Sequence, residues 1–230
     1  MKWTTRLKIM RITRITMIFC LVFLVLFAGF SLYGSKVGNF VVRIEEQNVK
    51  ISACITENTE KDATTRFSVP GIKGQDAATL SDLPERLSEG IGVKNDDKHK
   101  RYLAFSFYLL NRSERAVGYD MTVEIVDSVG KAIDVLRVML IEGDKTTAEG
   151  EIFAKPEDEA GKAHLIANNI TYETKDFISD EIVLKKTVEG FEVGGVVKYT
   201  VVLWLEGWDV ACTDELFGDR LKMRMNIQAY

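Results

Sequence analysis

The sequence predicts an all-β protein, an antiparallel two-sheet β-sandwich of jelly-roll or Greek-key type that is preceded by one N-terminal transmembrane helix. Three observations lead to this prediction. Residues 15–35 form an uncharged apolar run. Several later segments alternate between apolar and polar side chains, which is the period of a strand with one buried face. Apart from a few short pieces, residues 36–230 show no helical periodicity.

The first 35 residues predict a membrane anchor. The 21 uncharged residues of the run would make a helix of about 30 Å, the thickness of a bilayer's hydrocarbon core. Five Lys and Arg precede it, which predicts a cytoplasmic N-terminus. A cleaved signal peptide and a buried soluble helix are the alternatives; the run is long for the former and offers poor cleavage sites. We expect a basic cytoplasmic tail (1–14), an anchor (15–35), a stem (36–48) and an extracytoplasmic domain (49–230).

The exported part is acidic. The whole chain of 230 residues has a net charge of −4, but residues 36–230 carry 25 basic against 34 acidic side chains. Binding nucleic acid requires Lys and Arg that replace counterions along the phosphates. We therefore expect the membrane, other copies or cell-surface proteins as partners, and no nucleic acid.

The first part of the domain contains one clear strand and a long polar segment. Residues 49–55 alternate cleanly and predict a strand. Residues 56–101 predict mostly loop, with one short helix near 81–89 for which Asp82 is the expected N-cap. Residues 102–111 are apolar on both faces and predict a central strand, and 119–127 predict its hairpin partner.

The remaining elements follow in order along the chain. We expect a helical turn within 130–136, a strand at 137–142, a weaker strand within 146–155 and a polar stretch at 156–175. The glycines of 189–195 predict a hairpin turn before a strand at 196–206. Residues 220–229 alternate without error and predict the last strand.

The segment between these two last strands is rich in carboxylates. Its candidate calcium ligands are Glu206, Asp209, Asp214, Glu215 and Asp219. Their spacing does not fit the D-x-[DN]-x-[DN]-G loop, and a solvated connection between two strands explains the same residues. Catalysis by a pair of carboxylates is the third reading. Calcium is the one cofactor that the sequence suggests.

Cysteine usage leaves one candidate disulfide. Cys20 lies in the apolar run, so Cys54 and Cys212 are the only candidates for an intramolecular bridge. The alternation around Cys54 puts Ile51 and Ala53 on the buried face and its thiol on the other. Two free thiols are the alternative.

Catalytic motifs are absent from the sequence. It contains no H-E-x-x-H, C-x-x-C, G-x-S-x-G or P-loop pattern, and His99 and His164 stand in polar surroundings. We therefore predict no enzyme and assign no catalytic residue. Formal N-glycosylation sequons occur at Asn111 and Asn169.

The ending "YTVVLWLEGWDVACTDELFGDRLKMRMNIQAY", residues 199–230, resembles that of exported proteins of Gram-positive Firmicutes, a group similar to camelysin and TasA. Looser likeness extends to 38–52 and 105–125. The resemblance implies a jelly-roll-like sandwich outside the cytoplasmic membrane, in some relatives assembled into surface or matrix fibres. Camelysin is classed as a metallopeptidase, but this chain has no recognisable zinc-ligand set.

The sequence as a whole predicts a membrane-anchored or exported surface protein with a structural or interaction role. Free edge strands of a sandwich can accept a strand from a neighbouring chain, and residues 38–44 of the stem are a candidate donor. A calcium- or ligand-binding domain that uses residues 206–219 is one alternative. A secreted hydrolase is the other.

Overall fold

The computed structural model describes residues 16–24, 40–45, 49–71, 74–95, 98–156 and 172–230. Residues 16–24 form a helix with exposed side chains. No helix in these ranges is both long enough and apolar enough to cross a membrane. The predicted tail, most of the predicted anchor and residues 36–39 and 46–48 of the predicted stem lie outside the described residues.

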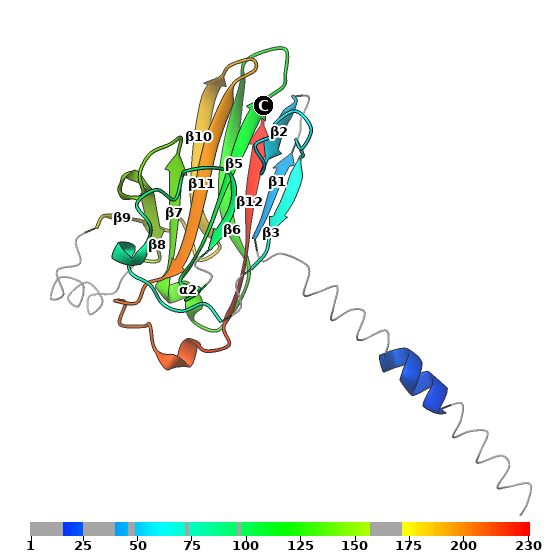
Figure 1. The fold of residues 1–230 in the computed structure, drawn as a ribbon, viewed down its shortest axis with the longest axis vertical. Coiled ribbons are helices and arrows are strands. Elements are labelled where there is room, and N and C mark those ends of the chain that lie inside the picture. Colours follow the sequence, from blue (N-terminus) through cyan, green and yellow to red (C-terminus); the bar gives the residue numbers. More distant parts are fainter. Residues whose placement is uncertain (1–15, 25–39, 46–48, 72–73, 96–97, 157–171) are drawn as a thin grey trace, which may run out of the picture. The chain divides into compact units, whose positions relative to one another are not determined.

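The body, residues 39–230, is a compact unit built from two β-sheets, as the sequence predicts (Figure 1). In spatial order the five-stranded sheet contains β10 (Ile182–Phe191), β6 (Val117–Val129), β12 (Arg220–Ala229), β1 (Phe40–Glu45) and β3 (Arg66–Val69). The seven-stranded sheet contains β2 (Ile51–Cys54), β5 (Tyr102–Asn111), β11 (Val196–Leu205), β7 (Leu136–Glu142), β8 (Glu151–Ala154) and β9 (Thr174–Asp176), with β4 (Gly92–Asn95) also paired to β5. The pairing is antiparallel except for β1 with β12 and β8 with β9.

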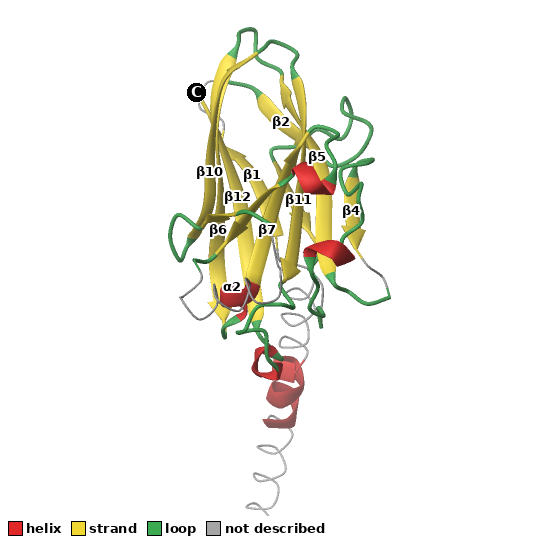
Figure 2. Ribbon diagram, turned by 90° about the vertical axis from the view of Figure 1, so that its left-hand side faces the viewer, coloured by secondary structure: helices red, strands yellow, loops and turns green. Residues whose placement is uncertain are grey.

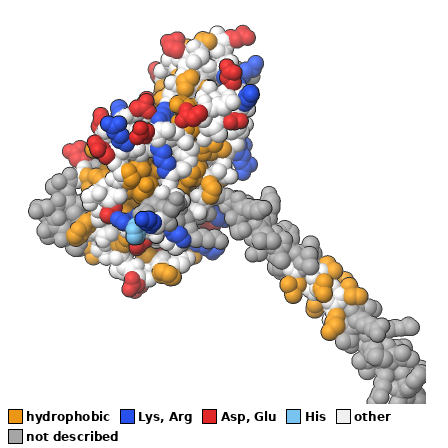
Figure 3. Space-filling view, in the orientation of Figure 1, with side chains coloured by type: hydrophobic (Ala, Val, Ile, Leu, Met, Phe, Trp, Pro, Cys, Tyr) orange, Lys and Arg blue, Asp and Glu red, His pale blue; other side chains and the backbone are white. Residues whose placement is uncertain are grey.

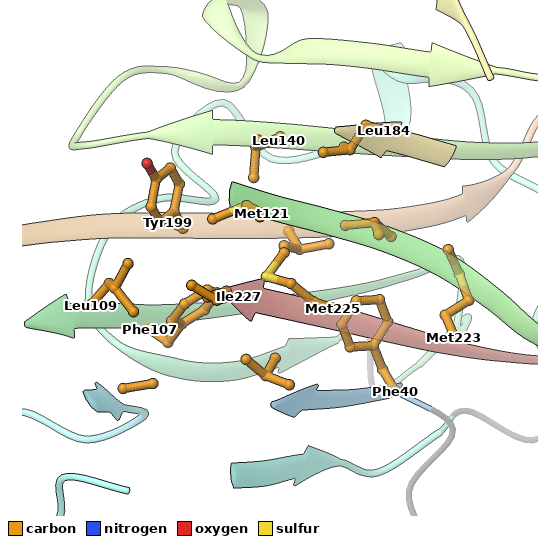
Figure 4. Close-up of a cluster of buried hydrophobic side chains, with 14 of the residues drawn as sticks. Phe40, Phe107, Leu109, Met121, Leu140, Leu184, Tyr199, Met223, Met225 and Ile227 are labelled. Carbon is orange, nitrogen blue, oxygen red and sulfur yellow. The ribbon is translucent and has the colours of Figure 1, made fainter. Parts of the chain in front are cut away.

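The main core fills the space between the two sheets (Figure 4). The alternation of β12 is confirmed, since Met223, Met225 and Ile227 are all buried. Apolar side chains of β5 meet them from the other sheet, among them Phe105, whose ring centroid lies 4.8 Å from that of Phe40. Burial of these inward faces holds the sheets together.

A second apolar cluster covers the outer face of the seven-stranded sheet. Ala78, Leu83 and Leu87 of the polar segment 74–91 pack there with side chains such as Ala104 and Trp204. This explains why residues 102–111 are apolar on both faces: one face of β5 meets the main core and the other meets this cluster.

The chain crosses between the sheets where the sequence predicted hairpins. β5 and β6 belong to different sheets, and so do β10 and β11 (Figure 2). Both hairpin predictions are therefore wrong. Alternation shows which face of a strand is buried, but two inward faces can equally meet across a core, as those of β5 and β6 do. The 206–219 loop makes a third crossing, from β11 to β12.

Several local predictions also need correction. Part of the predicted stem is β1, which lies inside the five-stranded sheet between β12 and β3. The expected helix near residue 81 is a 3₁₀ turn, η1 (Leu80–Asp82), and Asp82 accepts a hydrogen bond from the N–H of Thr79 instead of being the N-cap. Strands β3 and β4 lie within the predicted loop; their few residues are too short for a clear period. Helix α2 (Ala132–Val135) and the 3₁₀ turn η2 (Thr147–Glu149) complete this part.

Candidate functional site

The 206–219 loop lies at one end of the body, where β11 ends and β12 begins. We call this the loop end; in Figure 1 the loop is drawn in orange near α2, and the C-terminus is at the opposite end. Backbone hydrogen bonds fix the start of the loop: the N–H of Glu206 donates to Val135 and the N–H of Gly207 donates to Ala78, at 2.9 Å and 2.8 Å. The loop is thus joined both to α2 and to the segment that covers the outer face of the seven-stranded sheet.

Glu206 is the centre of a buried hydrogen-bond network. Its side chain is fully buried, and Oε2 accepts hydrogen bonds from Tyr172 Oη at 2.5 Å and from Trp204 Nε1 at 3.2 Å. Its Oε1 accepts the backbone N–H of Trp208 at 3.2 Å. Burial and the neighbouring Glu206 carboxyl raise the pKa of Tyr172. Because buried polar groups need partners, these three donors stabilise Glu206 where it lies.

Asp209 forms a buried ion pair with Arg137 of β7. Arg137 Nη2 lies 2.9 Å from Asp209 Oδ2, with side chains only 1 % and 3 % exposed. Burial lowers the pKa of Arg137, but Tyr172 and Asp209 raise it by more, so the net shift is upward. The other oxygen of Asp209 accepts the N–H of Ala211. Removing either charge would leave its partner buried without its counter-charge.

The other three carboxylates have separate surroundings. Asp219 Oδ2 accepts the backbone N–H groups of Lys131 and Ala132, at 2.6 Å and 2.9 Å, where α2 begins. Glu215 lies 3.8 Å from Lys131 Nζ on the surface. Asp214 begins the exposed 3₁₀ turn η3 (Asp214–Leu216).

These positions do not bring the five candidate calcium ligands together. In the described ranges, which include all five predicted ligands, no group of three or more His, Cys, Asp or Glu is placed to hold a metal ion. The physical reason is that Glu206 and Asp209 point into the body toward buried donors, while Asp219 binds backbone N–H groups. The carboxylates stabilise the loop individually.

The candidate disulfide between Cys54 and Cys212 is not formed, because both thiols are free, which is the alternative that the sequence left open. Cys54 lies in β2 beside Tyr108, whereas Cys212 follows the end of β11, where Trp204 pairs with Tyr102. Six residues along β5 separate these places by roughly 20 Å, far beyond the reach of a disulfide. Cys54 is fully buried, contrary to the face expected from alternation, since all four residues of β2 are buried.

The thiol of Cys212 is less acidic than an ordinary cysteine thiol. Burial, followed by the negative charges of Asp209 and Glu206, raises its pKa. A thiol reacts as its thiolate, so this environment lowers its reactivity at neutral pH. Nothing here activates Cys212 as a nucleophile.

Asn111, one of the two formal sequons, is buried. Its Nδ2 donates hydrogen bonds to the carbonyls of Arg115, Phe191 and Glu192, at 2.8–3.0 Å. Because this nitrogen would carry a glycan, the folded chain offers no attachment point there. Asn169 and His164 lie outside the described residues, and His99 is exposed.

A pocket of about 790 Å³ lies beside β6, β10 and β12. Opposite charges within it already pair: Arg224 Nη2 lies 2.6 Å from Glu124 Oε2, and Lys155 Nζ lies 3.8 Å from Asp180. The visible face of the body in Figure 3 likewise has acidic and basic side chains interspersed with apolar ones. The pocket is lined by Glu124, Ile125, Val126, Asp127, Ser128, Ile133, Lys155, Asp180, Glu181, Ile182 and Arg224.

Sequence reasoning missed the partners of the acidic loop, Arg137 and Tyr172. One signal was present: Arg137 stands in the otherwise apolar run "VLRVMLI", and a charged residue at such a position is rarely buried without an opposite charge. Nothing in the sequence identified Tyr172 as the donor to Glu206. Its contact with β11 depends on how the chain folds over the sheet.

Comparisons with known proteins leave the family of this chain open. No family model matches it, and no curated protein matches it. Among solved structures, two crystal structures of β-glucosidase from Kluyveromyces marxianus are similar at 11 % and 10 % identity, with TM-scores of 0.23 and 0.22. Each match covers 76 % of this chain but only 17 % and 16 % of the enzyme. A likeness this low carries no argument about fold or function.

Proposed function

We propose that this chain is a membrane-anchored or exported bacterial surface protein whose β-sandwich has a structural or interaction role, and that copies assemble by exchanging β1. The observation that supports the exchange is the position of β1 in the five-stranded sheet. It is the first strand of the body, and it lies between β12 and β3.

Strand β1 occupies a position in the five-stranded sheet that β1 of a second copy could also occupy. It pairs in parallel with β12 from Phe40 opposite Met223 to Glu45 opposite Gln228. Its inward side chains Phe40, Val42 and Ile44 are at most 5 % exposed, and all belong to the main core. The same strand from a second copy would make identical hydrogen bonds and contacts, which is the condition for domain swapping.

Export and anchoring rest on the sequence. The uncharged run 15–35 and the basic residues before it support a single span with the N-terminus inside. The resemblance of residues 199–230 to the camelysin and TasA group supports a Gram-positive surface protein. The sheet-crossing connections after β5, β10 and β11 support a jelly-roll or Greek-key arrangement.

Two single-cysteine variants of the full chain test the exchange. Arg43 of β1 and Asn226 of β12 are direct partners, so cysteines there would lie about 4.8 Å apart at Cα, within disulfide range. The native cysteines are first replaced. Arg43→Cys chains and Asn226→Cys chains, co-expressed with different tags, should form a mixed disulfide dimer.

The matched control replaces Asn226→Cys by Lys185→Cys. Lys185 is exposed and lies on β10, two strands away from β12. This pair should remain uncross-linked. If the Arg43→Cys and Asn226→Cys chains also give no mixed dimer at any expression level, assembly by β1 exchange is wrong.

A further inference from the structure

The 206–219 loop carries three exposed apolar side chains, Trp208, Val210 and Phe217, which we call the apolar tip. They are 47 %, 54 % and 94 % exposed. Exposed apolar surface is unfavourable in water, and where it gathers on a folded body it usually marks a contact with another molecule or a membrane. The apolar tip is therefore a candidate contact surface.

The buried network holds the apolar tip outward. Glu206 accepts the N–H of Trp208, Asp209 accepts that of Ala211, and Asp219 binds the start of α2. The N–H of Phe217 donates to Asp214 within η3. Because its backbone is fixed on both sides, the loop presents Phe217 to the surroundings instead of folding it onto the core.

The apolar tip lies at the same end of the body as the start of β1. Strand β1 runs parallel to β12, with Phe40 opposite Met223. Strand β12 begins three residues earlier, at Arg220, so its start lies about 10 Å beyond the N-terminal end of β1. The loop that bears the tip immediately precedes Arg220.

The connection between the uncharged run and β1 is short in sequence. Only residues 36–39 separate the uncharged run from β1, and four residues span at most about 14 Å. If the run spans a membrane, as proposed above, the outer surface of the bilayer must lie within that distance of Phe40.

The charges around the apolar tip favour an uncharged interface. Lys131 is paired with Glu215, and Asp219 is occupied by backbone N–H groups. Asp214 and Arg220 are exposed and of opposite sign. Anionic lipids are recognised by clusters of Lys and Arg, which this loop lacks. Tryptophan and other aromatic side chains suit the interfacial zone of a bilayer whatever its charge.

We propose that the apolar tip inserts into the interface of the membrane that holds the chain's own anchor. This rests on the proposed anchoring. Because the anchor already holds the chain at the membrane, contact between the apolar tip and the bilayer is intramolecular. A few apolar side chains are then enough to maintain it. Contact at both the anchor and the tip would fix the orientation of the sandwich on the membrane.

Quenching of Trp208 by brominated lipid tests this in the full chain. Trp3→Phe removes the tryptophan near the anchor, and Trp204 is fully buried, so Trp208 is the exposed reporter. The chain is reconstituted into phosphatidylcholine vesicles with or without dibrominated acyl chains. Trp208 emission should be lower in the brominated vesicles, and the loss should not change with salt.

Phe217→Ser should remove most of this quenching, because it deletes the most exposed apolar side chain of the tip. The control is Val193→Ser, which changes a side chain of similar kind, 56 % exposed, in the connection that precedes Val196. Val196 pairs with Leu110, at the opposite end of β5 from the loop. Val193→Ser should leave the quenching unchanged.

Retention of the chain in vesicles after an alkaline carbonate wash separates this proposal from the proposed anchoring. If the chain is retained but Trp208 is not quenched by bromine, the tip proposal is wrong and the anchoring stands. Protection of Trp208 from aqueous iodide without bromine quenching would assign the tip to a second copy and also overturn it. If the chain washes off, both proposals fail.

Discussion

The hydroxyl groups of Tyr119 and Tyr199 form a 2.7 Å hydrogen bond inside the main core, where each side chain is at most 1 % exposed. Tyr119 belongs to β6 and Tyr199 to β11, so this bond joins the two sheets. Either hydroxyl alone would be a buried polar group without this partner.

Tyr199→Phe should lower the free energy of unfolding by about 1–3 kcal/mol, because it leaves the hydroxyl of Tyr119 buried without its hydrogen bond. Urea unfolding measures this. The double variant Tyr119→Phe/Tyr199→Phe should lose less than the sum of the two single variants. If the loss in free energy of unfolding of the double variant equalled the sum of the two single losses, the two hydroxyls would not interact.

Alkaline pH should destabilise the protein through the same pair. Burial raises the pKa of Tyr119 to about 12, although its hydrogen bond with Tyr199 acts in the opposite direction, and burial raises the pKa of Tyr199 as well. A raised pKa contributes stability that is complete below the unfolded value near 10. That stability is lost as pH rises toward the folded value, by about 1.4 kcal/mol per pH unit for each tyrosine. Urea midpoints between pH 9 and 12 measure this, and Tyr119→Phe should reduce the slope.

Asp209→Ala should be among the most damaging substitutions in the 206–219 loop. It leaves the Arg137 guanidinium buried without its counter-charge, so the free energy of unfolding should fall by about 3–5 kcal/mol. Chemical denaturation measures the loss. Glu215→Ala, which breaks an exposed pair, should change stability by less than about 1 kcal/mol. Equal losses for the two variants would contradict a buried ion pair.

Asp219→Ala should destabilise the start of α2 by about 1 kcal/mol, because two backbone N–H groups lose their acceptor. Gly130→Ala tests the same contact from the other side. Gly130 has φ of +89°, and a Cβ there would lie 1.8 Å from Asp219 Oδ1. Thermal unfolding should show both losses, whereas Asp214→Ala should leave the midpoint nearly unchanged.

The two cysteines of the body should differ in reactivity. Cys54 is fully buried and should resist a maleimide in the native protein, while the half-exposed Cys212 should react slowly at pH 7 and faster as pH rises, because its pKa is raised. Intact-mass spectrometry measures the labelling. A mass that indicates a disulfide between Cys54 and Cys212 would contradict the structure.

The sequence predicted which residues face inward better than it predicted which strands are neighbours. The alternation of 220–229 identified the buried face of β12, because one face meets the core and the other meets water. The same signal could not show that β5 lies beside β11 instead of β6, because strand pairing depends on contacts far apart in the chain. The sequence named Glu206 and Asp209 only as candidate calcium ligands, because their actual partners Tyr172 and Arg137 come from distant segments.

Because β1 and β12 lie side by side and point the same way, the body begins near one end of their shared ladder and finishes near the other. A mechanical pull that separates the two termini therefore shears this ladder lengthwise and loads its hydrogen bonds together instead of unzipping them one after another. If one of these termini were held and the other pulled, the body would resist a force applied along the two strands.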